Sequence, residues 1–243
     1  AHLAGNRRRT ARLEAMNREL AIVGATATGK SALGLRLAEA SGGEIVNADA
    51  LQVYRGLDIG TAKPARAERA RVTHHLIDLL DPTEPFSAGE FARRARRALA
   101  EIAGRGHPAI VVGGSGLYLR ALEGGLAPLP PADLARRAEL EARRVSEGLA
   151  PLRAELERLD PATAARLAPR DTQRTLRALE VVLATGRPLS SWLAQAPRPA
   201  PPPVALRKIG LTLPRGVLYD RIGSRVETMV AQGWIDEVRG LLA

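Results

Sequence analysis

The stretch Gly24-Ala25-Thr26-Ala27-Thr28-Gly29-Lys30-Ser31 fits G-x-x-x-x-G-K-[ST], the pattern of a phosphate-binding loop. An apolar run at residues 20–23 precedes it, and residues 31–40 follow with apolar positions at helical spacing. This order of strand, loop and helix lets backbone N–H groups surround phosphate oxygens at the positive end of a helix dipole. The sequence therefore predicts a site for a phosphorylated ligand rather than an ordinary glycine turn, with Lys30 on the terminal oxygens and Ser31 able to hold Mg²⁺.

Composition bounds the class of protein. The 243 residues suit one large domain, or a core with an insertion, and the absence of cysteine excludes disulfides and thiolate metal sites. No apolar run approaches the ~20 residues of a membrane span and no secretory signal is recognisable, so we expect a cytoplasmic protein without membrane contact. The net charge of +10 favours a polyanionic partner, although charge alone leaves nucleic-acid binding open. Residues 1–15, with three consecutive arginines, are interpreted as a basic leader outside the fold.

A second buried strand is predicted at residues 44–48, and Asp49 follows at its carboxyl end. In open α/β sheets that end of the strands faces the ligand crevice, so Asp49 is expected to point toward the bound ligand. The alternative is that Asp49 is an ordinary surface carboxylate without a role in ligand binding. Residues 49–64 have no clean period and are rich in polar groups and glycine, which is typical of a functional loop.

Residues 74–82 contain two adjacent histidines and two aspartates, which raises the question of a metal site. Adjacent histidines point away from each other, so a short strand that leads to a turn is the favoured interpretation. Ser87 and Glu90 form the Ser-x-x-Glu pattern of a capping box, which predicts a helix that runs to Ala103.

The most apolar strand is predicted at residues 108–112, and it leads directly into Gly113-Gly114-Ser115-Gly116. Phosphate-loop ATPases usually carry an aspartate at the end of this strand, to hold Mg²⁺ and order water. Because Val112 is followed by two glycines, ATP hydrolysis as a motor function is not expected. Ser115 is either a hydroxyl that contacts a ligand or part of a turn.

Residues 119–169 are rich in arginine and are expected to form several short amphipathic helices, with no strand among them. A strong helix follows at residues 171–183, then a strand at 206–211 and helices at 217–230 and 234–242. The predicted fold is an α/β P-loop NTPase-like parallel sheet flanked by helices, with a helical insertion subdomain. Its core is expected to comprise residues 16–118 and 170–243, and the insertion residues 119–169.

Five blocks of sequence, in this order, resemble the tRNA dimethylallyltransferase family. They are residues 24–31, 47–64, 112–118, 171–181 and 218–226, and the resemblance extends from about residue 20 to the end. It implies transfer of the dimethylallyl group of dimethylallyl diphosphate to N6 of adenosine 37 in tRNA, after the base leaves its stack. It also implies that the phosphate loop binds the donor's diphosphate, which would account for the absent acid after Val112.

The resemblance further implies roles for individual residues. Asp49 matches the general base that accepts the N6 proton, and Ser115 matches a position that contacts the target base. Arg225 matches the arginine that joins Lys30 in neutralising the departing diphosphate. The implied diphosphate-binding residues are Gly24, Ala25, Thr26, Ala27, Thr28, Gly29, Lys30 and Ser31, with Mg²⁺ on Ser31. The implied tRNA-binding residues, which would contact the anticodon arm, are Asp49, Ala50, Leu51, Gln52, Ser115, Arg137, Gln173, Arg174, Thr175, Leu176 and Arg177. The enzyme is expected to be a monomer.

Two features depart from the family's pattern. Ala50 stands where a hydroxyl residue is usual, and family chains continue for several tens of residues beyond residue 243. Three other functions remain open from the sequence: a prenyltransferase acting on free adenine nucleotides, an ATP-dependent small-molecule kinase with Asp49 activating a hydroxyl, and a nucleotide-regulated RNA-binding protein. The arginine-rich insertion counts against the kinase, because a small acceptor needs no such subdomain.

Overall fold

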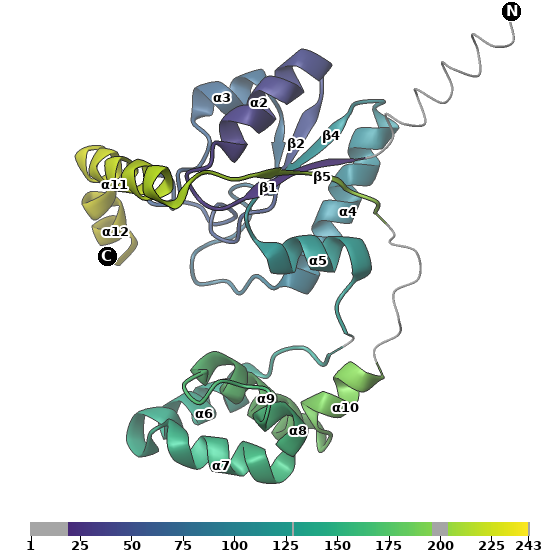
Figure 1. Ribbon diagram of the computed structural model, residues 1–243, viewed down its shortest axis with the longest axis vertical. Coiled ribbons are helices and arrows are strands. Elements are labelled where there is room, and N and C mark those ends of the chain that lie inside the picture. The colour runs from purple at the N-terminus through teal and green to yellow at the C-terminus, as the bar shows by residue number, and fades with distance from the viewer. Residues whose placement is uncertain (1–18, 128, 196–203, 243) are drawn as a thin grey trace, which may run out of the picture. The chain divides into compact units, whose positions relative to one another are not determined.

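The structure is a computed structural model, and it describes residues 19–127, 129–195 and 204–242. These residues form two compact units, one made of residues 19–125 and 204–242 and the other of the described residues between 126 and 195 (Figure 1). The predicted leader at residues 1–15 lies outside the described residues. Within the described part of the chain, no helix has both the length and the apolar character that crossing a membrane would need.

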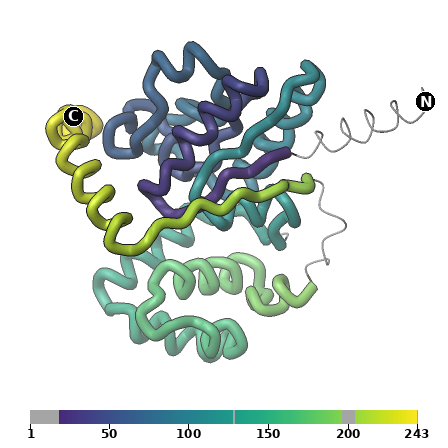
Figure 2. Tube along the Cα trace, turned by 45° about the horizontal axis from the view of Figure 1, so that its top comes forward, coloured from purple at the N-terminus to yellow at the C-terminus, as the bar shows by residue number. Residues whose placement is uncertain are grey.

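The first unit is built on a parallel sheet of five strands in the order β3-β2-β4-β1-β5. The strands are β1 (Leu20–Gly24), β2 (Glu44–Asn47), β3 (His74–His75), β4 (Ala109–Val112) and β5 (Arg207–Leu211). Figure 2 shows β5 running alongside β1, where Ala21 pairs with Lys208. On the other side of β1, Ala21 pairs with Val111 of β4. All five predicted strands are therefore confirmed, including the short one at the histidine pair.

Helices cover both faces of the sheet because successive strand residues point to opposite sides. Ala21, Val46 and Val111 pack with α4 (Ala88–Gly104) and α5 (Gly116–Gly124) in one buried cluster. Their neighbours Ile22, Ile45 and Ile110 pack with α2 (Lys30–Ser41) in another. Near-continuous apolar runs are typical of such strands, which are buried on both faces. The predicted P-loop-like α/β fold is confirmed.

Local signals in the sequence set several helix ends. Ser87 precedes α4, and its hydroxyl oxygen accepts a hydrogen bond from the backbone N–H of Glu90 at 3.1 Å, which is one half of the predicted capping box. The Glu90 carboxylate pairs with Arg93 and Arg94. The short helix α3 (Arg66–Arg71) follows the long loop after β2. After β5, α11 (Arg215–Ala231) and α12 (Trp234–Leu242) complete the unit and contact each other.

The second unit contains α6 (Leu134–Glu147), α7 (Leu149–Leu159), α8 (Pro161–Ala164), α9 (Thr172–Thr185) and α10 (Leu189–Ala194). Its core is a cluster of buried apolar side chains that includes Leu140, Leu152, Leu156 and Leu179. The predicted insertion, residues 119–169, needs correction at both boundaries. Residues up to 125 stay with the core, because Leu119 and Leu122 of α5 are buried against α4, and α9 joins the helical unit, because its apolar face packs against α6 and α7.

Candidate active site

The phosphate-binding loop joins β1 to α2, and glycine is required at its first residue. Gly24 has φ of 150°, and a Cβ there would lie 2.4 Å from the carbonyl oxygen of Leu211 on β5. Gly29, the N-cap residue before α2, has φ of 94° in the left-handed conformation. Between them the Thr28 hydroxyl donates to the carbonyl of Ala25 at 2.8 Å. The local geometry is the strand, loop and helix that the sequence predicted.

A cavity of about 470 Å³ opens beside this loop. Its wall includes Lys30 from the start of α2, Asp49 from the loop after β2, and Arg225 from α11. Nη1 of Arg225 lies 3.4 Å from the Thr26 hydroxyl of the phosphate-binding loop. Three residues separated by up to 195 positions therefore line one cavity, as the resemblance implied, and Arg221 of α11 lines it as well.

Asp49 is half-buried and held in a defined orientation. Its Oδ1 accepts a hydrogen bond from the backbone N–H of Leu51 at 2.9 Å, the pattern of an Asx-turn. The neighbouring strand end comes very close, since a Cβ on Gly113 would lie 2.2 Å from the carbonyl oxygen of Ala48. The glycine after Val112, which replaces the ATPase aspartate, thus allows the ends of β2 and β4 to converge beside Asp49.

The charges in the cavity are mostly positive. Burial lowers the pKa of Lys30, while the negative charge of Asp49 acts in the opposite direction and the positive charge of Arg225 adds to the lowering. The Lys30 ammonium donates to the Ala25 carbonyl within the loop at 2.5 Å. An anion entering the cavity would meet Lys30, Arg221 and Arg225 together, which is the electrostatic environment that a diphosphate requires.

Tyr118 is a residue near the site that sequence reasoning did not single out. It is buried on α5 and stacks on Phe91, with 4.4 Å between the ring centroids. Burial, with smaller contributions from Tyr54 and the charge of Asp49, raises the pKa of Tyr118 to about 12. The phenol therefore stays neutral at physiological pH. Its position after the Gly113-Gly114 pair could have suggested a role, because this segment follows a strand end.

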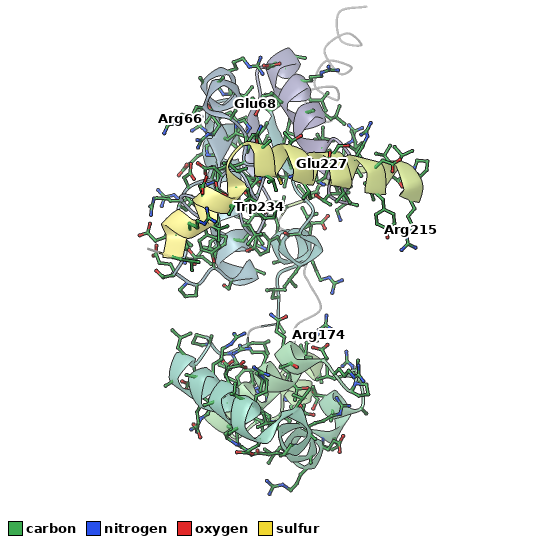
Figure 3. All side chains as sticks on the ribbon, turned by 90° about the vertical axis from the view of Figure 1, so that its left-hand side faces the viewer. Arg66, Glu68, Arg174, Arg215, Glu227 and Trp234 are labelled. Carbon is green, nitrogen blue, oxygen red and sulfur yellow. The ribbon has the colours of Figure 1, made fainter. Side chains whose placement is uncertain are left out.

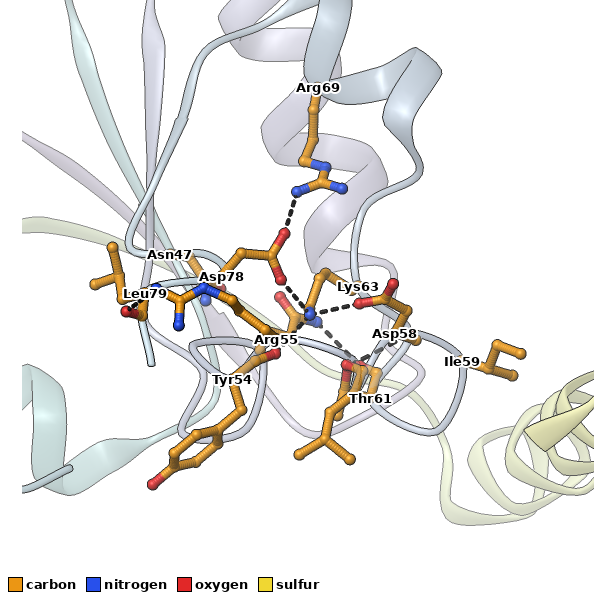
Figure 4. A network of polar contacts seen from close by, with 12 residues as sticks. Asn47, Tyr54, Arg55, Asp58, Ile59, Thr61, Lys63, Arg69, Asp78 and Leu79 are labelled. Atoms are coloured by element: carbon orange, nitrogen blue, oxygen red, sulfur yellow. Dashed lines mark hydrogen bonds and ion pairs between the residues drawn. The ribbon is translucent and has the colours of Figure 1, made fainter. Parts of the chain in front are cut away.

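The loop of residues 49–64 is held together by its own polar groups. Gln52 is buried and donates from Nε2 to the carbonyls of Thr61 and Ala62 at 3.0 and 3.1 Å. Lys63, whose side chain is 1% exposed, donates to the Tyr54 carbonyl and to the carboxylates of Asp58 and Asp78 (Figure 4). Gln52, for which the resemblance implies contact with tRNA, uses both N–H groups of its amide inside the protein and also lines the cavity beside Asp49.

Three further residues for which the resemblance implies contact with the tRNA, Ser115, Ala50 and Leu51, lie in the same unit as the cavity. Ser115 is half-buried at the start of α5 and is not among the described residues that line the first cavity. Its neighbours Gly114 and Gly116 line a second cavity of about 710 Å³, which also reaches Gly24. Ala50 is half-buried and packs near the core, whereas the Leu51 side chain is 54% exposed.

In the helical unit, the predicted tRNA-binding residues divide into two groups. Gln173 and Arg174 are exposed in the first turn of α9, and Arg137 is exposed on α6. The guanidinium of Arg174 pairs with the capping residue Asp171 at 2.6 Å and remains 75% exposed. These three side chains are accessible to a ligand.

The second group faces the interior of the unit. Thr175 and Leu176 are buried, so their side chains cannot serve the tRNA contact expected of them, because the helical period turns them toward the core. Arg177 pairs with the buried carboxylate of Glu180 and donates to the Pro130 carbonyl at 2.8 Å. Its guanidinium holds residues before α6 against α9, which is a structural task that the sequence pattern did not reveal.

A family model described as IPP transferase matches residues 52–243. The chain belongs to this family. The tRNA dimethylallyltransferases of Geobacter metallireducens and Geobacter sulfurreducens are similar to it, with 52% and 53% identity. These matches cover 95% and 91% of this chain, and 74% and 71% of those two proteins. The family predicted from the five sequence blocks is confirmed.

Solved structures of the family also match. The chain resembles the full-length tRNA isopentenylpyrophosphate transferase of Bacillus halodurans at 41% identity and a TM-score of 0.61, covering 93% of this chain and 70% of that one. It also resembles a eukaryotic dimethylallyltransferase acting on tRNA, at 26% identity and a TM-score of 0.74, covering 93% and 56%. The family is therefore a prenyltransferase family. Neither the small-molecule kinase nor the nucleotide-regulated RNA-binding protein is favoured as an alternative function.

Proposed function

We propose that this chain transfers the dimethylallyl group of dimethylallyl diphosphate to N6 of adenosine 37 in tRNA and releases diphosphate. The observation that supports this most strongly is the cavity that Lys30, Asp49 and Arg225 line together. It combines cations for a leaving diphosphate with one carboxylate that can take a proton. We further propose that the enzyme acts as a monomer in the cytoplasm.

The donor's diphosphate is proposed to occupy the phosphate-binding loop. Backbone N–H groups at the start of α2, with Lys30 and Arg225, would surround its oxygens. Negative charge grows on the diphosphate as the bond between C1 and oxygen breaks, so cations at this position stabilise the transition state more than the bound donor. Arg221, which also lines the cavity, is proposed to add to this effect.

Mg²⁺ is the proposed cofactor, and the residues present fit its usual mode of binding to phosphorylated ligands. Ser31 is exposed at the cavity wall and could contribute its hydroxyl oxygen. No group of three or more carboxylate or imidazole side chains suited to a metal occurs among the described residues. The remaining ligands would then be diphosphate oxygens and water, since Mg²⁺ commonly keeps several waters and few protein ligands. When bound, Mg²⁺ would neutralise charge on the leaving diphosphate.

Asp49 is proposed to act as the general base. As the N6 nitrogen forms its bond to C1 of the donor, the C1–oxygen bond breaks and the N6 proton passes to a carboxylate oxygen of Asp49. The Asx-turn to Leu51 engages Oδ1 and would keep the carboxylate aimed while leaving acceptor capacity for this proton. Ser115 is proposed to contact the target base, which must leave its stack to be reached.

The exposed residues of the helical unit are proposed to contact the anticodon arm. Arg137 and Arg174 would meet phosphates, and Gln173 could hydrogen-bond to phosphate or base. Leu51, exposed beside Asp49, is proposed to stack against the extruded nucleotide. Thr175 and Leu176 are not included, because their side chains are buried.

A direct test is incubation with ¹⁴C-labelled dimethylallyl diphosphate and either tRNA that lacks the modification or AMP. Label should appear in tRNA, at position 37 after nuclease mapping, and not in AMP. Label in AMP alone would show a prenyltransferase of free adenine nucleotides. A parallel incubation with γ-labelled ATP should give no transfer of phosphate, and phosphate transfer would favour the kinase.

A further inference from the structure

A carboxylate from the end of the described chain fills a small anion-binding concavity in the loop of residues 49–64. Glu237 of α12 accepts hydrogen bonds from three consecutive backbone N–H groups, those of Asp58, Ile59 and Gly60, at 2.8, 2.7 and 3.0 Å. Successive N–H groups in a turn form such a concavity for anions. Here the anion is a side chain from 179 positions further along the chain.

The same face of α12 makes two further close contacts with this loop. A Cβ on Gly60 would lie 2.0 Å from Nε1 of Trp234, so the indole packs directly against backbone. A Cβ on Gly56 would lie 3.3 Å from the Leu241 side chain. Trp234, Glu237 and Leu241 are spaced three and four apart, which places them on one face of a helix. We call the contact of these three residues with residues 56–60 the α12 clamp.

The loop that the α12 clamp grips is fixed to the cavity wall. Lys63 ties Asp58 to Asp78, and Asp78 also pairs with Arg69 of α3 (Figure 4). The Thr61 hydroxyl donates to the Leu57 carbonyl at 2.6 Å. Because these ion pairs and hydrogen bonds join the loop to α3 and to the segment after β3, the loop is a firm point of attachment for α12.

The helix that precedes α12 carries the two arginines of the cavity. Arg221 and Arg225 both lie on α11, and Figure 3 shows Trp234 at the start of α12, where the chain turns after α11. Among the described residues of α11, Met229 is the only buried one, so packing of α11 itself gives it little support. The bond from Arg225 to Thr26 is long, at 3.4 Å. The attachment of α12 therefore constrains the C-terminal end of α11, whose N-terminal end follows strand β5 of the sheet.

We propose that Glu237 is a positioning residue for the donor site, which acts through the α12 clamp to hold Arg225 and Arg221 at the cavity. The inference rests on the proposed function, because it assumes that the cavity binds the donor's diphosphate. Loss of the carboxylate leaves three N–H groups without their partner and loosens α12. The arginines of α11 then spend less time at the cavity, and the affinity for diphosphate falls while Asp49 is untouched.

The test compares Glu237→Gln with Asp236→Asn in the full chain. Asp236 is the adjacent carboxylate, 78% exposed, and pairs only with Arg239 of the same helix among the described residues. Binding of inorganic diphosphate is measured by calorimetry with Mg²⁺ present. Glu237→Gln should weaken it about three- to tenfold, since the amide keeps only one acceptor oxygen, has no charge, and turns an NH2 donor toward at least one of the three backbone N–H groups. Asp236→Asn should bind as the unchanged chain does.

A double-mutant cycle with Arg225→Ala separates positioning from a general loss of structure. If Glu237 acts through the arginines of α11, Glu237→Gln should weaken diphosphate binding in the unchanged chain and have a smaller effect, limited to the share of Arg221, once Arg225 is alanine. Strictly additive losses would overturn the inference. Gly60→Ala disrupts the α12 clamp from the loop, because the added methyl group displaces Trp234. If Glu237→Gln does not fold, Gly60→Ala replaces it in the cycle and should give the same non-additive loss.

The outcomes also separate this inference from the proposed function. If Arg225→Ala binds diphosphate as well as the unchanged chain, the donor site is wrong and the inference falls with it. If Arg225→Ala weakens binding while Glu237→Gln and Gly60→Ala both match Asp236→Asn, the inference is overturned and the donor site stands.

Discussion

A carboxylate lies at each end of β2, and the two differ in how many of their acceptor sites the protein itself fills. At the amino end, Glu44 is buried, receives two hydrogen bonds from Arg105 at 2.8 Å, and contacts His75 and His107 at 2.6 and 2.8 Å. At the carboxyl end, Asp49 is half-buried, takes one hydrogen bond from backbone, and faces a cavity. A carboxylate whose acceptor sites are filled by the protein stabilises the fold, whereas one with remaining capacity can accept a proton from a substrate.

The two lysines of the cavity wall repeat this contrast. Lys63 is buried and directs its three N–H groups to Tyr54, Asp58 and Asp78. Lys30 is half-buried and bonds to the Ala25 carbonyl of its own loop. A loop carbonyl is readily exchanged for a phosphate oxygen, so Lys30 can bind an anionic ligand. Lys63, whose N–H groups all have partners in the protein, stabilises the fold instead.

The strongest test of the comparison is Asp49→Ala. It should lower turnover by ~10²–10⁴-fold, the usual range for a general base, with little change in tRNA affinity or melting temperature. Single-turnover transfer of labelled dimethylallyl is the measurement. The matched control is Asp81→Asn, an exposed carboxylate paired with Arg55, which should transfer at the normal rate. Near-normal turnover of Asp49→Ala would rule out the assignment.

Exchanging the two lysines for alanine should separate binding from stability. Lys30→Ala should weaken diphosphate binding by about 10–100-fold, because a charge-assisted contact to an anion is lost, and should barely change stability. Lys63→Ala should lower the free energy of unfolding by about 2–3 kcal/mol, since Asp58 and Asp78 lose their shared cation. Calorimetry and urea unfolding of both variants are the measurements. Similar stability losses in the two variants would contradict the contrast.

At the other end of β2, Glu44→Gln should reduce stability in a pH-dependent way. The guanidinium of Arg105, with His75 and His107, lowers the pKa of Glu44 to about 2, although burial acts in the opposite direction. A lowered pKa contributes stability above the ordinary value near 4.5, and that contribution is lost as the pH falls toward 2. The variant should lose about 1–2 kcal/mol at pH 7, because part of the cluster is exposed to solvent.

The deficit of Glu44→Gln should shrink steadily between pH 4.5 and the lowest pH at which the protein remains folded. Urea unfolding across this range is the measurement, with Glu101→Gln as the control. Glu101 pairs with Arg97 on the surface of α4, and its removal should leave stability nearly unchanged at every pH, because exposed ion pairs contribute little. A deficit that does not vary with pH would mean that Glu44 acts through packing alone.

The smallest effects are expected on the surface of the helical unit. Arg137→Ala and Arg174→Ala should each weaken tRNA binding by a few fold and reduce the slope of log affinity against log salt by ~0.7–0.9 per lost phosphate contact. Neither should affect diphosphate binding. Binding across a salt series is the measurement. Unchanged slopes in both variants would exclude these arginines from the RNA surface.

Arg177→Ala supplies the internal comparison for this unit. Because Glu180 is buried and pairs with Arg177, the variant should lower the stability of the helical unit as well as its tRNA affinity. A loss of affinity without any loss of stability would restore the direct tRNA contact that the sequence resemblance implies for Arg177.

Sequence reasoning was most accurate where a local pattern has one physical solution. The glycines of residues 24–31 admit a phosphate-binding turn, and apolar runs such as residues 109–112 form strands buried on both faces. It was less accurate for residue roles on α9. The resemblance implies tRNA contact for the whole block of residues 173–177, whereas the helical period turns Thr175 and Leu176 of that block toward the core.

By itself, the sequence determined the family, the phosphate-binding loop, the parallel sheet and the carboxylate at the end of β2. The loop and the strands follow from local patterns of glycine and apolar residues, the parallel sheet from the alternation of strands with helices, and the family from five blocks that occur in order. Only the tertiary structure decided that α9 belongs to the helical unit, that Gln52 and Lys63 serve the loop, and that Glu237 binds the backbone of residues 58–60. Each of these depends on groups brought together from distant positions, where burial and the competition for hydrogen-bond partners set the outcome.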